Sequence, residues 1–326
     1  MKWILFSSLV FLAVGCWDGE LVGSNPTPYT EEIPYYFPTM PVSLENPSTV
    51  EGVELGRRLY YDKILHNSQA MSCSECHHQS NSFTTAGSNS LAHINIGWNS
   101  SFLWNGKVEG DLEDIMLFEV EDFFSTNIDN LNNHNEYPLL FEKVFGVSEI
   151  TSKEVAYALA QFFRTLNSYN SKYDKIQLGL ESFTPEEWDG FDIFYSERGD
   201  CFHCHGGALF SNNLFHNNGL DAVPANGRYT ITNNSADIGK FKTPTLRNIE
   251  FTAPYMHDGR YQTLEEVVDF YSHGLVWSPT IDPLMKNVNI SSGVNLSASE
   301  KANLILFLKT LSDTSYLTNP AISDPF

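Results

Sequence analysis

The chain has 326 residues, of which 42% are hydrophobic and 13% aromatic, so it can bury a sizeable core, and its length favours two domains over one. The 19 Lys and Arg against 40 Asp and Glu give a formal net charge of −21 at pH 7. A surface this acidic excludes nucleic acid as a partner, because nucleic acid binds to a basic face. It fits either a basic protein partner attracted by charge or an acidic surface kept for solubility.

The N-terminus has the pattern of an export signal. Lys2 is followed by an apolar run within residues 1–15, which is typical of a secretory signal peptide and too short for a membrane-spanning helix. Cys16 stands where a lipoprotein signal peptidase cuts, which predicts an acylated Cys16 as the mature N-terminus. The alternative is a secreted protein that loses Cys16 with its signal. No other segment of the sequence is long and apolar enough to span a bilayer.

The first half of the chain has helical patterns separated by loops. Residues 16–45 are rich in Pro, Gly, Thr and Glu, which indicates a tether and an extended arm. Ser48 or Thr49 then caps a predicted helix that runs through Tyr60. Residues 78–110 are rich in Ser, Asn and Gly, and an irregular stretch of this length is uncommon unless it is functional. Two further helices are predicted in this half, at 111–124 and 152–167.

A second helical unit begins at Thr184. Thr184 is a predicted N-cap, and Glu187 closes a capping box with it. This helix ends near Gly199. The last strong helix is predicted at 297–311, with Ser297 as its cap. No segment shows sustained alternation of apolar and polar residues, so the sequence predicts an all-α fold with long loops.

The pattern C-x-x-C-H occurs twice and uses four of the five cysteines. It is the attachment pattern of a c-type haem, in which the two thiols bond to the haem vinyl groups and the adjacent His becomes the proximal iron ligand. The residues concerned are Cys73, Cys76 and His77 in the first motif and Cys201, Cys204 and His205 in the second. A zinc site built from paired cysteines would not need a His after each pair. A thioredoxin-like redox pair would need a βαβ pattern that neither motif has.

Each half of the chain therefore contains a helix, a haem motif, a long loop and further helices. This is the layout of cytochrome c used twice, and it predicts a domain with one haem at 46–180 and another at 181–326. Covalent haem is attached outside the cytoplasm, so the export signal and the motifs agree. Four free thiols in an oxidising compartment would otherwise pair as disulfides.

Beyond these motifs, residues 45–315 resemble the bacterial dihaem cytochrome c peroxidases and their relative MauG. The first matching segment is F-L-W-N-G at 102–106, with Asn105 where the family usually has Asp. The other matching segments are Y-P-L-L-F through F-G at 137–146, F-K-T-P-T-L-R-N at 241–248, T-A-P-Y-M-H-D-G at 252–259 and T-L-E-E-V-V-D-F-Y at 263–271.

The resemblance implies a dihaem c-type oxidoreductase that uses hydrogen peroxide. The haem on His77 would bind peroxide, the haem on His205 would hold or relay the oxidising equivalent, and Trp104 would lie between them. Such an enzyme either reduces peroxide with electrons from a small c-type cytochrome or, like MauG, oxidises another substrate through a high-valent state. The alternative is a non-enzymatic dihaem electron-transfer cytochrome with two six-coordinate irons, which the ferric spin state would distinguish.

The leader, Cys16 and the haem motifs together predict an exported protein, on the periplasmic side of the membrane or in the outer membrane as a lipoprotein. The oligomeric state stays open, with a homodimer as one candidate.

The sixth ligand of the second haem departs from the classical peroxidases. They have Met after the L-E-E-x-V run, whereas this chain has Tyr271, as MauG-like proteins do. A Met ligand raises the potential, while an anionic tyrosinate favours the higher oxidation states. The alternative is that Tyr271 only packs and that Met256 or Met285 binds the iron.

The distal side of the first haem departs as well. His93 is the only nearby candidate for the family's distal His, but it stands further along the chain than that residue. We therefore expect an open, five-coordinate first haem. The family's distal Gln matches Ile115, and Glu119 or Glu121 would replace the family's distal Glu as an acid/base group.

The family carries a calcium ion between its domains, and the ligands map to the Asn89 side chain and to the carbonyls of Thr252 and Pro254. Oxygen ligands with waters suit Ca²⁺, although ordinary loop residues would give the same pattern. His257 matches a family His near the second haem and is expected to hydrogen-bond there. Arg247 is a candidate partner for a haem propionate.

Overall fold

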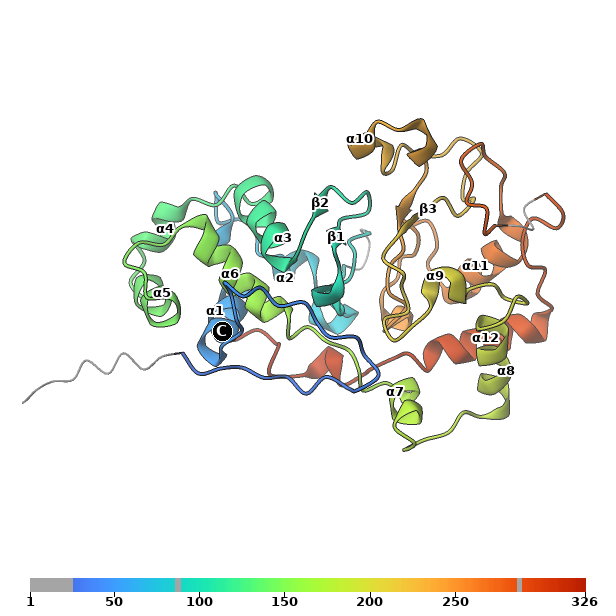
Figure 1. Cartoon of the computed structure of the whole chain (residues 1–326), viewed down its shortest axis with the longest axis horizontal. Helices are drawn as coiled ribbons and strands as arrows, with labels where there is room; N and C mark the ends of the chain where they lie inside the picture. The colour runs from blue at the N-terminus through green and yellow to red at the C-terminus, as the bar shows by residue number, and fades with distance from the viewer. Residues whose placement is uncertain (1–25, 86–88, 286–288) are drawn as a thin grey trace, which may run out of the picture.

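The computed structural model describes residues 26–85, 89–285 and 289–326. The predicted signal peptide and Cys16 lie outside these residues. Figure 1 shows two helical lobes side by side, an N-terminal lobe (50–166) and a C-terminal lobe (185–311), with the short helix α7 (Lys172–Gln177) between them in the chain. Among the helices that are described, none is long and apolar enough to cross a membrane.

The N-terminal lobe consists of helices and one short β ladder. Its first helix begins where the sequence predicts, because the Thr49 hydroxyl accepts a hydrogen bond from the Gly52 N–H. In chain order the elements are α1 (Val50–Tyr61), η1 (Lys63–Leu65), α2 (Cys73–Cys76), η2 (Gln79–Asn81), η3 (Ile96–Trp98), β1 (Ser101–Phe102), β2 (Val108–Glu109), α3 (Leu112–Phe118), η4 (Glu119–Phe123), α4 (Ile128–Asn132), α5 (Tyr137–Phe145) and α6 (Ser152–Phe163).

The C-terminal lobe repeats this plan. Capping boxes form at Thr184 and Ser297, as predicted. The elements are α8 (Pro185–Phe194), α9 (Phe202–His205), β3 (Phe215–His216), α10 (Tyr229–Thr232), η5 (Ser235–Asp237), β4 (Phe241–Lys242), η6 (Ile249–Phe251), α11 (Leu264–Asp269), η7 (Phe270–Gly274), α12 (Ala298–Lys309) and, in the C-terminal tail, η8 (Tyr316–Thr318). The segments η4 and η7 are π-helical turns, and the other η segments are short 3-10 helices.

The expectation of an all-α fold needs one correction. The described chain contains two antiparallel ladders, β1 with β2 and β3 with β4. In the second ladder Phe215 pairs with Lys242 and His216 pairs with Phe241. Each strand has only two residues, which is too short to produce an alternating pattern in the sequence. Helices still dominate both lobes.

Both lobes use a glycine to bring two helices into close contact. A Cβ atom at Gly56 of α1 would lie 1.9 Å from the carbonyl oxygen of Ala158 in α6. A Cβ atom at Gly190 of α8 would lie 2.0 Å from the carbonyl oxygen of Asn303 in α12. In each lobe the glycine-bearing helix is the one that precedes the haem motif in the chain.

The described N-terminal arm (26–49) and the C-terminal tail both pack along the N-terminal lobe. The N-terminal arm is extended but packed, since Glu31 accepts hydrogen bonds from Asn167 and Tyr169. At the other end, Tyr316 and Ile322 are buried in the hydrophobic core of the N-terminal lobe. Figure 1 shows the blue arm passing along the N-terminal lobe to α7 and back, and the red C-terminal segment passing from α12 to the N-terminal lobe. The domain boundaries at 46, 180 and 181 stay a prediction, and the last residues of the second range pack on the first lobe.

Candidate functional site

Each predicted haem motif lines a cavity. The first cavity has a volume of about 940 Å³ and is lined by Cys73, Cys76 and His77. The second cavity is smaller, with a volume of about 220 Å³, and is lined by Cys201, Cys204 and His205. The two cavities share a wall, which consists of Trp104, Phe241, Lys242, Thr243, Pro244, Ile249, Tyr255, Met256 and His257.

The two motif histidines have the same environment. Nδ1 of His77 donates to the carbonyl oxygen of Phe83 at 2.8 Å, and Nδ1 of His205 donates to that of Phe210 at 3.1 Å. Burial lowers the pKa of each imidazole to about 4, so each ring is neutral. A neutral imidazole held through Nδ1 leaves Nε2 free to bind a metal.

The four motif cysteines also fit a covalent cofactor. All four thiols are free, and each pair brackets about one turn of a short helix, α2 or α9, beside its own cavity. The residues present in each cavity therefore match the donor set of a c-type haem.

Trp104 lies in the shared wall at the tip of the β1–β2 hairpin. Its indole N–H donates to the carbonyl of Asn89 at 2.9 Å, and its own carbonyl accepts from the backbone N–H of Lys242 at 2.9 Å. Gly106 closes the turn with φ +70°, and a Cβ atom there would lie 2.4 Å from the Phe215 ring. The hairpin thus holds an indole against both cavities.

His93 lies beside the proximal histidine of the first cavity. The imidazole rings of His93 and His77 stack with centroids 3.6 Å apart and 14° between their planes. The Tyr60 hydroxyl is 3.2 Å from Nδ1 of His93. A ring stacked on His77 is on the His77 side of the cavity, and not across from it.

The two candidate acid/base residues differ in environment. Glu119 starts the π-helical turn η4 and lines the first cavity, where burial raises the pKa of its carboxyl to about 7. Glu121 is exposed and is not among the cavity-lining residues. Ile115, at the position matching the family's Gln, also lines the cavity and supplies no proton-transfer group. Of the two carboxylates, only Glu119 is placed to exchange a proton with a ligand in this cavity.

Tyr271 lines the second cavity from the π-helical turn η7. Its hydroxyl accepts a hydrogen bond of 3.0 Å from the Asn218 side chain, whose amide nitrogen is 3.6 Å from the sulfur of Met256. Burial raises the pKa of Tyr271 to about 12. Met285 lines the same cavity. The structure therefore brings Tyr271 and both competing methionines together around one cavity.

The three predicted calcium ligands come together near the shared wall. Asn89, Thr252 and Pro254 all line the first cavity. The Asn89 side-chain amide donates to the carbonyl of Met256, which fixes the side chain beside the 252–256 segment. Segments more than 150 residues apart in the chain thus meet at this point. The ion itself stays a prediction.

His257 lines both cavities and stacks on Phe241, with ring centroids 3.6 Å apart and 13° between the planes. Burial lowers the pKa of His257, so the ring is neutral and can hydrogen-bond to a group in either cavity.

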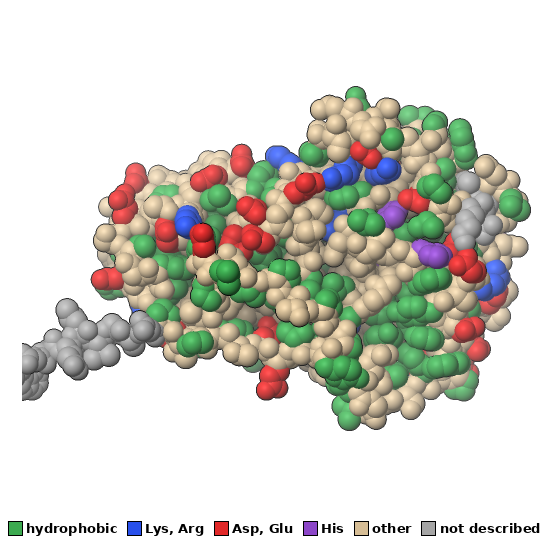
Figure 2. All heavy atoms as spheres, viewed as in Figure 1, with side chains coloured by type: hydrophobic (Ala, Val, Ile, Leu, Met, Phe, Trp, Pro, Cys, Tyr) green, Lys and Arg blue, Asp and Glu red, His purple; other side chains and the backbone are tan. Residues whose placement is uncertain are grey.

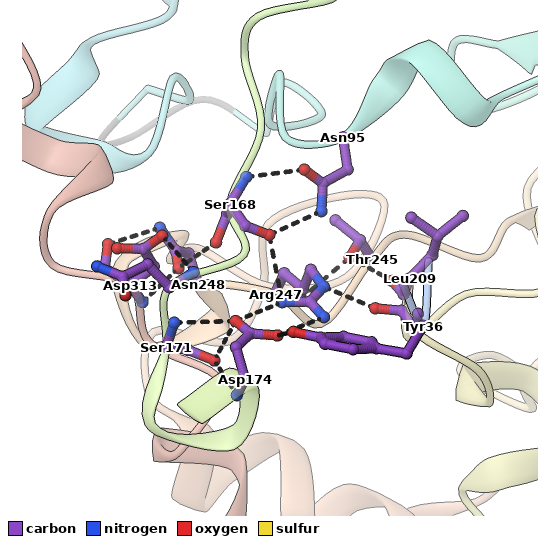
Figure 3. Close-up of polar contacts among 12 residues, drawn as sticks. Tyr36, Asn95, Ser168, Ser171, Asp174, Leu209, Thr245, Arg247, Asn248 and Asp313 are labelled. Carbon is purple, nitrogen blue, oxygen red and sulfur yellow. Dashed lines mark hydrogen bonds and ion pairs between the residues drawn. The ribbon is translucent and has the colours of Figure 1, made fainter. Parts of the chain in front are cut away.

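Arg247 is fully buried and forms a bidentate ion pair with Asp174, with both contacts at 2.9 Å (Figure 3). Its guanidinium also donates to the carbonyls of Ala208 and Ser168, and Tyr36 of the N-terminal arm donates to Asp174. Burial by itself would raise the pKa of Asp174, but Arg247 outweighs burial and holds that pKa below its ordinary value. Arg247 borders the first cavity with most of its donors already used by the protein.

Nothing in the sequence singles out three further groups at the site, although Lys242 lies within the matching segment at 241–248. Asn218 contacts Tyr271, and Lys242 lies in the shared wall. His216 lines the second cavity and forms a contact of 2.6 Å from Nδ1 to Asp282, which raises its pKa. These residues reach the cavities from separate loops and strands, so no local spacing marks them.

The sequence is similar to known proteins over most of its length. The family profile of di-haem cytochrome c peroxidases matches residues 50–182. A cytochrome-c peroxidase of Denitromonas iodatirespirans is 30% identical over 309 residues, covering 80% of this chain and 81% of that protein. The methylamine utilization protein MauG of Methylorubrum extorquens is 31% identical over 294 residues, covering 84% of this chain and 81% of MauG.

Solved structures agree with the sequence matches. A MauG-like protein associated with microbial copper homeostasis superposes with a TM-score of 0.82 at 31% identity and covers 91% of this chain and 99% of its own. The diheme peroxidase BthA from Burkholderia thailandensis has a TM-score of 0.63 at 17% identity, covers 86% of this chain and 91% of its own, and shows likeness of fold alone. The chain therefore belongs to the family of di-haem cytochrome c peroxidases and MauG.

Proposed function

We propose that this protein is a dihaem oxidoreductase that reduces hydrogen peroxide in the His77 cavity and draws electrons through the His205 cavity. The observation that carries the proposal is the pair of cavities, each with a complete C-x-x-C-H set and with Trp104 in the wall between them. Haem, when bound, supplies the redox chemistry, and the protein supplies binding, orientation and proton transfer.

Peroxide binding needs an open face and a group that moves protons. The stacking of His93 on His77 supports an open face for peroxide, because a ring held against His77 would be out of reach of the side of a bound iron that faces away from His77. Reduction of one hydrogen peroxide to two water molecules consumes two electrons and two protons. We assign Glu119 to take a proton from one peroxide oxygen and deliver it to the other, and its pKa of about 7 suits both steps.

The second cavity favours the MauG-like form of this activity over the peroxidase form. Tyr271 stands where classical peroxidases have Met. Burial raises its pKa and keeps the hydroxyl neutral, but a phenol that binds iron would lose its proton, and an anionic ligand favours higher oxidation states. In this form the electrons come from another substrate. In the second candidate form a small c-type cytochrome supplies the electrons. The net charge of −21 favours a basic donor protein, and Figure 2 shows acidic side chains on both lobes.

An anaerobic titration with hydrogen peroxide, followed by absorbance, tests the proposed function. We expect the ferric holoprotein to show mixed high- and low-spin signals and to react stoichiometrically with peroxide. Trp104→Phe should keep both haems and slow communication between them. A purely low-spin protein that does not react with peroxide would instead be an electron-transfer cytochrome.

The role of Tyr271 is testable by removing only its oxygen. Tyr271→Phe keeps the ring and deletes the ligand atom, so the low-spin signal of the second haem should change, because the axial ligand sets the spin state and the potential. Tyr271→Met should raise the potential of the second haem. A low-spin spectrum that stays unchanged in Tyr271→Phe would assign the ligand to Met256 or Met285, and Met256→Leu and Met285→Leu would tell these two apart.

We also propose a Ca²⁺ ion held by Asn89, Thr252 and Pro254 beside the shared wall. Chelation should change the haem spectra or the rate of reaction with peroxide, and added Ca²⁺ should restore them, because the ligands join two distant segments at the cavity. Elemental analysis before and after chelation measures the ion. Unchanged haem spectra and an unchanged reaction rate in calcium-free protein would contradict the proposed Ca²⁺ site.

The leader pattern supports export to the periplasmic side of the membrane, with Cys16 as an acylated N-terminus. Mass spectrometry of the membrane fraction should detect a lipid on Cys16, and Cys16→Ser should release the protein into the soluble fraction. A mature wild-type protein that begins after residue 16 would contradict the lipid anchor and leave export intact.

A further inference from the structure

Lys242 is a buried cation in the wall between the two cavities. Its exposed fraction is 4%, and it lines both cavities. Its ammonium group donates to the side-chain oxygen of Asn213 at 3.1 Å and lies 3.5 Å from the hydroxyl of Ser101. Both neighbours are neutral, and they come from different lobes, so Lys242 bridges the lobes at the wall.

Lys242 differs from the other basic side chains that are buried in the described part of the chain. Arg164 pairs with Glu113, and Arg247 pairs with Asp174. Among the residues that the structure describes, no carboxylate pairs with Lys242. Burial is the sole cause that lowers its pKa, to about 8, with no contribution from a charged neighbour.

A buried ammonium group without a counter-ion is costly. The penalty for taking a charge out of water is several kcal/mol per ion after relaxation, and a nearby opposite charge offsets it. Each cavity presents the donor set of a c-type haem, and a haem carries propionate carboxylates. A propionate at the shared wall would give Lys242 the opposite charge that the protein does not provide.

We propose that Lys242 is the counter-ion of a haem propionate at the wall between the two cavities. The inference rests on the occupation of both cavities by haem, which is part of the proposed function. It also places a positive charge next to the electron path, because the backbone N–H of Lys242 donates to the carbonyl of Trp104 at 2.9 Å. Lys242 is thus a positioning residue, and it favours the reduced state of the haem that it contacts.

A crystal structure of the wild-type holoprotein tests the contact directly. We expect a propionate oxygen within hydrogen-bonding distance of Nζ of Lys242. A structure in which both haems are present and every propionate lies beyond ion-pairing distance of Nζ would overturn the proposal. This measurement does not depend on whether any variant folds.

Spectroelectrochemistry tests the electrostatic consequence. Lys242→Met removes the charge at similar length, so the reduction potential of the contacted haem should shift to a lower value while both haems stay attached. Lys242→Arg keeps the charge and should restore much of the potential. Lys240→Met is the matched control, because Lys240 is two residues away, partly exposed and already paired with Asp237 at 3.0 Å. Equal potentials in Lys242→Met and wild type would contradict the proposal.

The outcomes separate this inference from the proposed function. If the wild-type holoprotein contains two haems but fails to react with peroxide, the proposed function fails, and the potentials and the crystal structure still decide the role of Lys242. If peroxide reacts and the potentials of Lys242→Met are unchanged, Lys242 serves only to hold Asn213 and the proposed function stands.

Discussion

Glu119→Gln should slow the reaction with hydrogen peroxide by about 100- to 10,000-fold at pH 7, the usual contribution of a positioned acid/base group. The carboxylate form that accepts a proton becomes populated as the pH rises through about 7, because burial raises the pKa of Glu119 to that value. The wild-type rate should therefore rise across this range, and the rate of the variant should not. Stopped-flow absorbance between pH 5 and pH 9 measures both.

Glu121→Gln is the matched control, since it makes the same chemical change on the same turn at an exposed residue outside the cavity lining. Its rate should equal that of the wild type. If Glu121→Gln loses activity and Glu119→Gln does not, the assignment of the acid/base residue is wrong.

Glu119→Gln should slow the reaction but make the folded protein more stable at high pH. A raised pKa means that the stability contributed by protonated Glu119 is full below pH 4.5 and is lost as the pH rises through about 7. Glu119→Gln stays neutral and should avoid this loss, which corresponds to about 3 kcal/mol in the free energy of unfolding at pH 8. Denaturant unfolding at pH 4 and pH 8 measures the difference.

Arg247→Met should lower the free energy of unfolding by about 3–5 kcal/mol at pH 7, because it leaves the Asp174 carboxylate buried without its partner. Asp174 keeps only hydrogen bonds from neutral groups such as Tyr36 and Ser171. Its pKa is lowered by the pair, so the stabilisation is present above pH 3.8 and lost as the pH falls through the folded-state pKa. The difference between variant and wild type should therefore shrink in acid.

Two further variants isolate the ion pair. Arg247→Met combined with Asp174→Leu should recover much of the stability, because no unpaired charge is then left inside. Arg58→Met removes a surface contact of 2.8 Å to Glu136 and should cost about 1 kcal/mol or less. Equal losses in Arg247→Met and Arg58→Met would mean that burial of the Arg247–Asp174 pair adds nothing to the cost of breaking it.

Features that depend on neighbouring residues were predictable from the sequence. The haem motifs require two thiols and an imidazole within one turn of helix, so their five-residue spacing is visible in the chain. Helix starts at Thr49, Thr184 and Ser297 were predictable because a cap and its partner lie within four residues of each other. The family, and through it the place of Trp104 and Tyr271, followed from segments that are also local.

The roles decided by contacts between distant segments needed the tertiary structure. The sequence left Glu119 and Glu121 equivalent, and only the π-helical turn puts one inside the cavity and the other in water. The contact of Arg247 with a propionate stays a prediction, whereas its ion pair with Asp174, 73 residues away in the chain, could be found only in the tertiary structure.

The shared wall shows the same dependence on tertiary structure. In the sequence, Lys242 is one residue of the matching segment at 241–248. Only the structure shows that its side chain is buried with no carboxylate paired to it among the described residues. The sequence by itself thus predicted a haem for each lobe, because the attachment pattern is local. Burial and charge pairing depend on segments that the fold brings together, so only the tertiary structure decided which titratable side chains face the cavities.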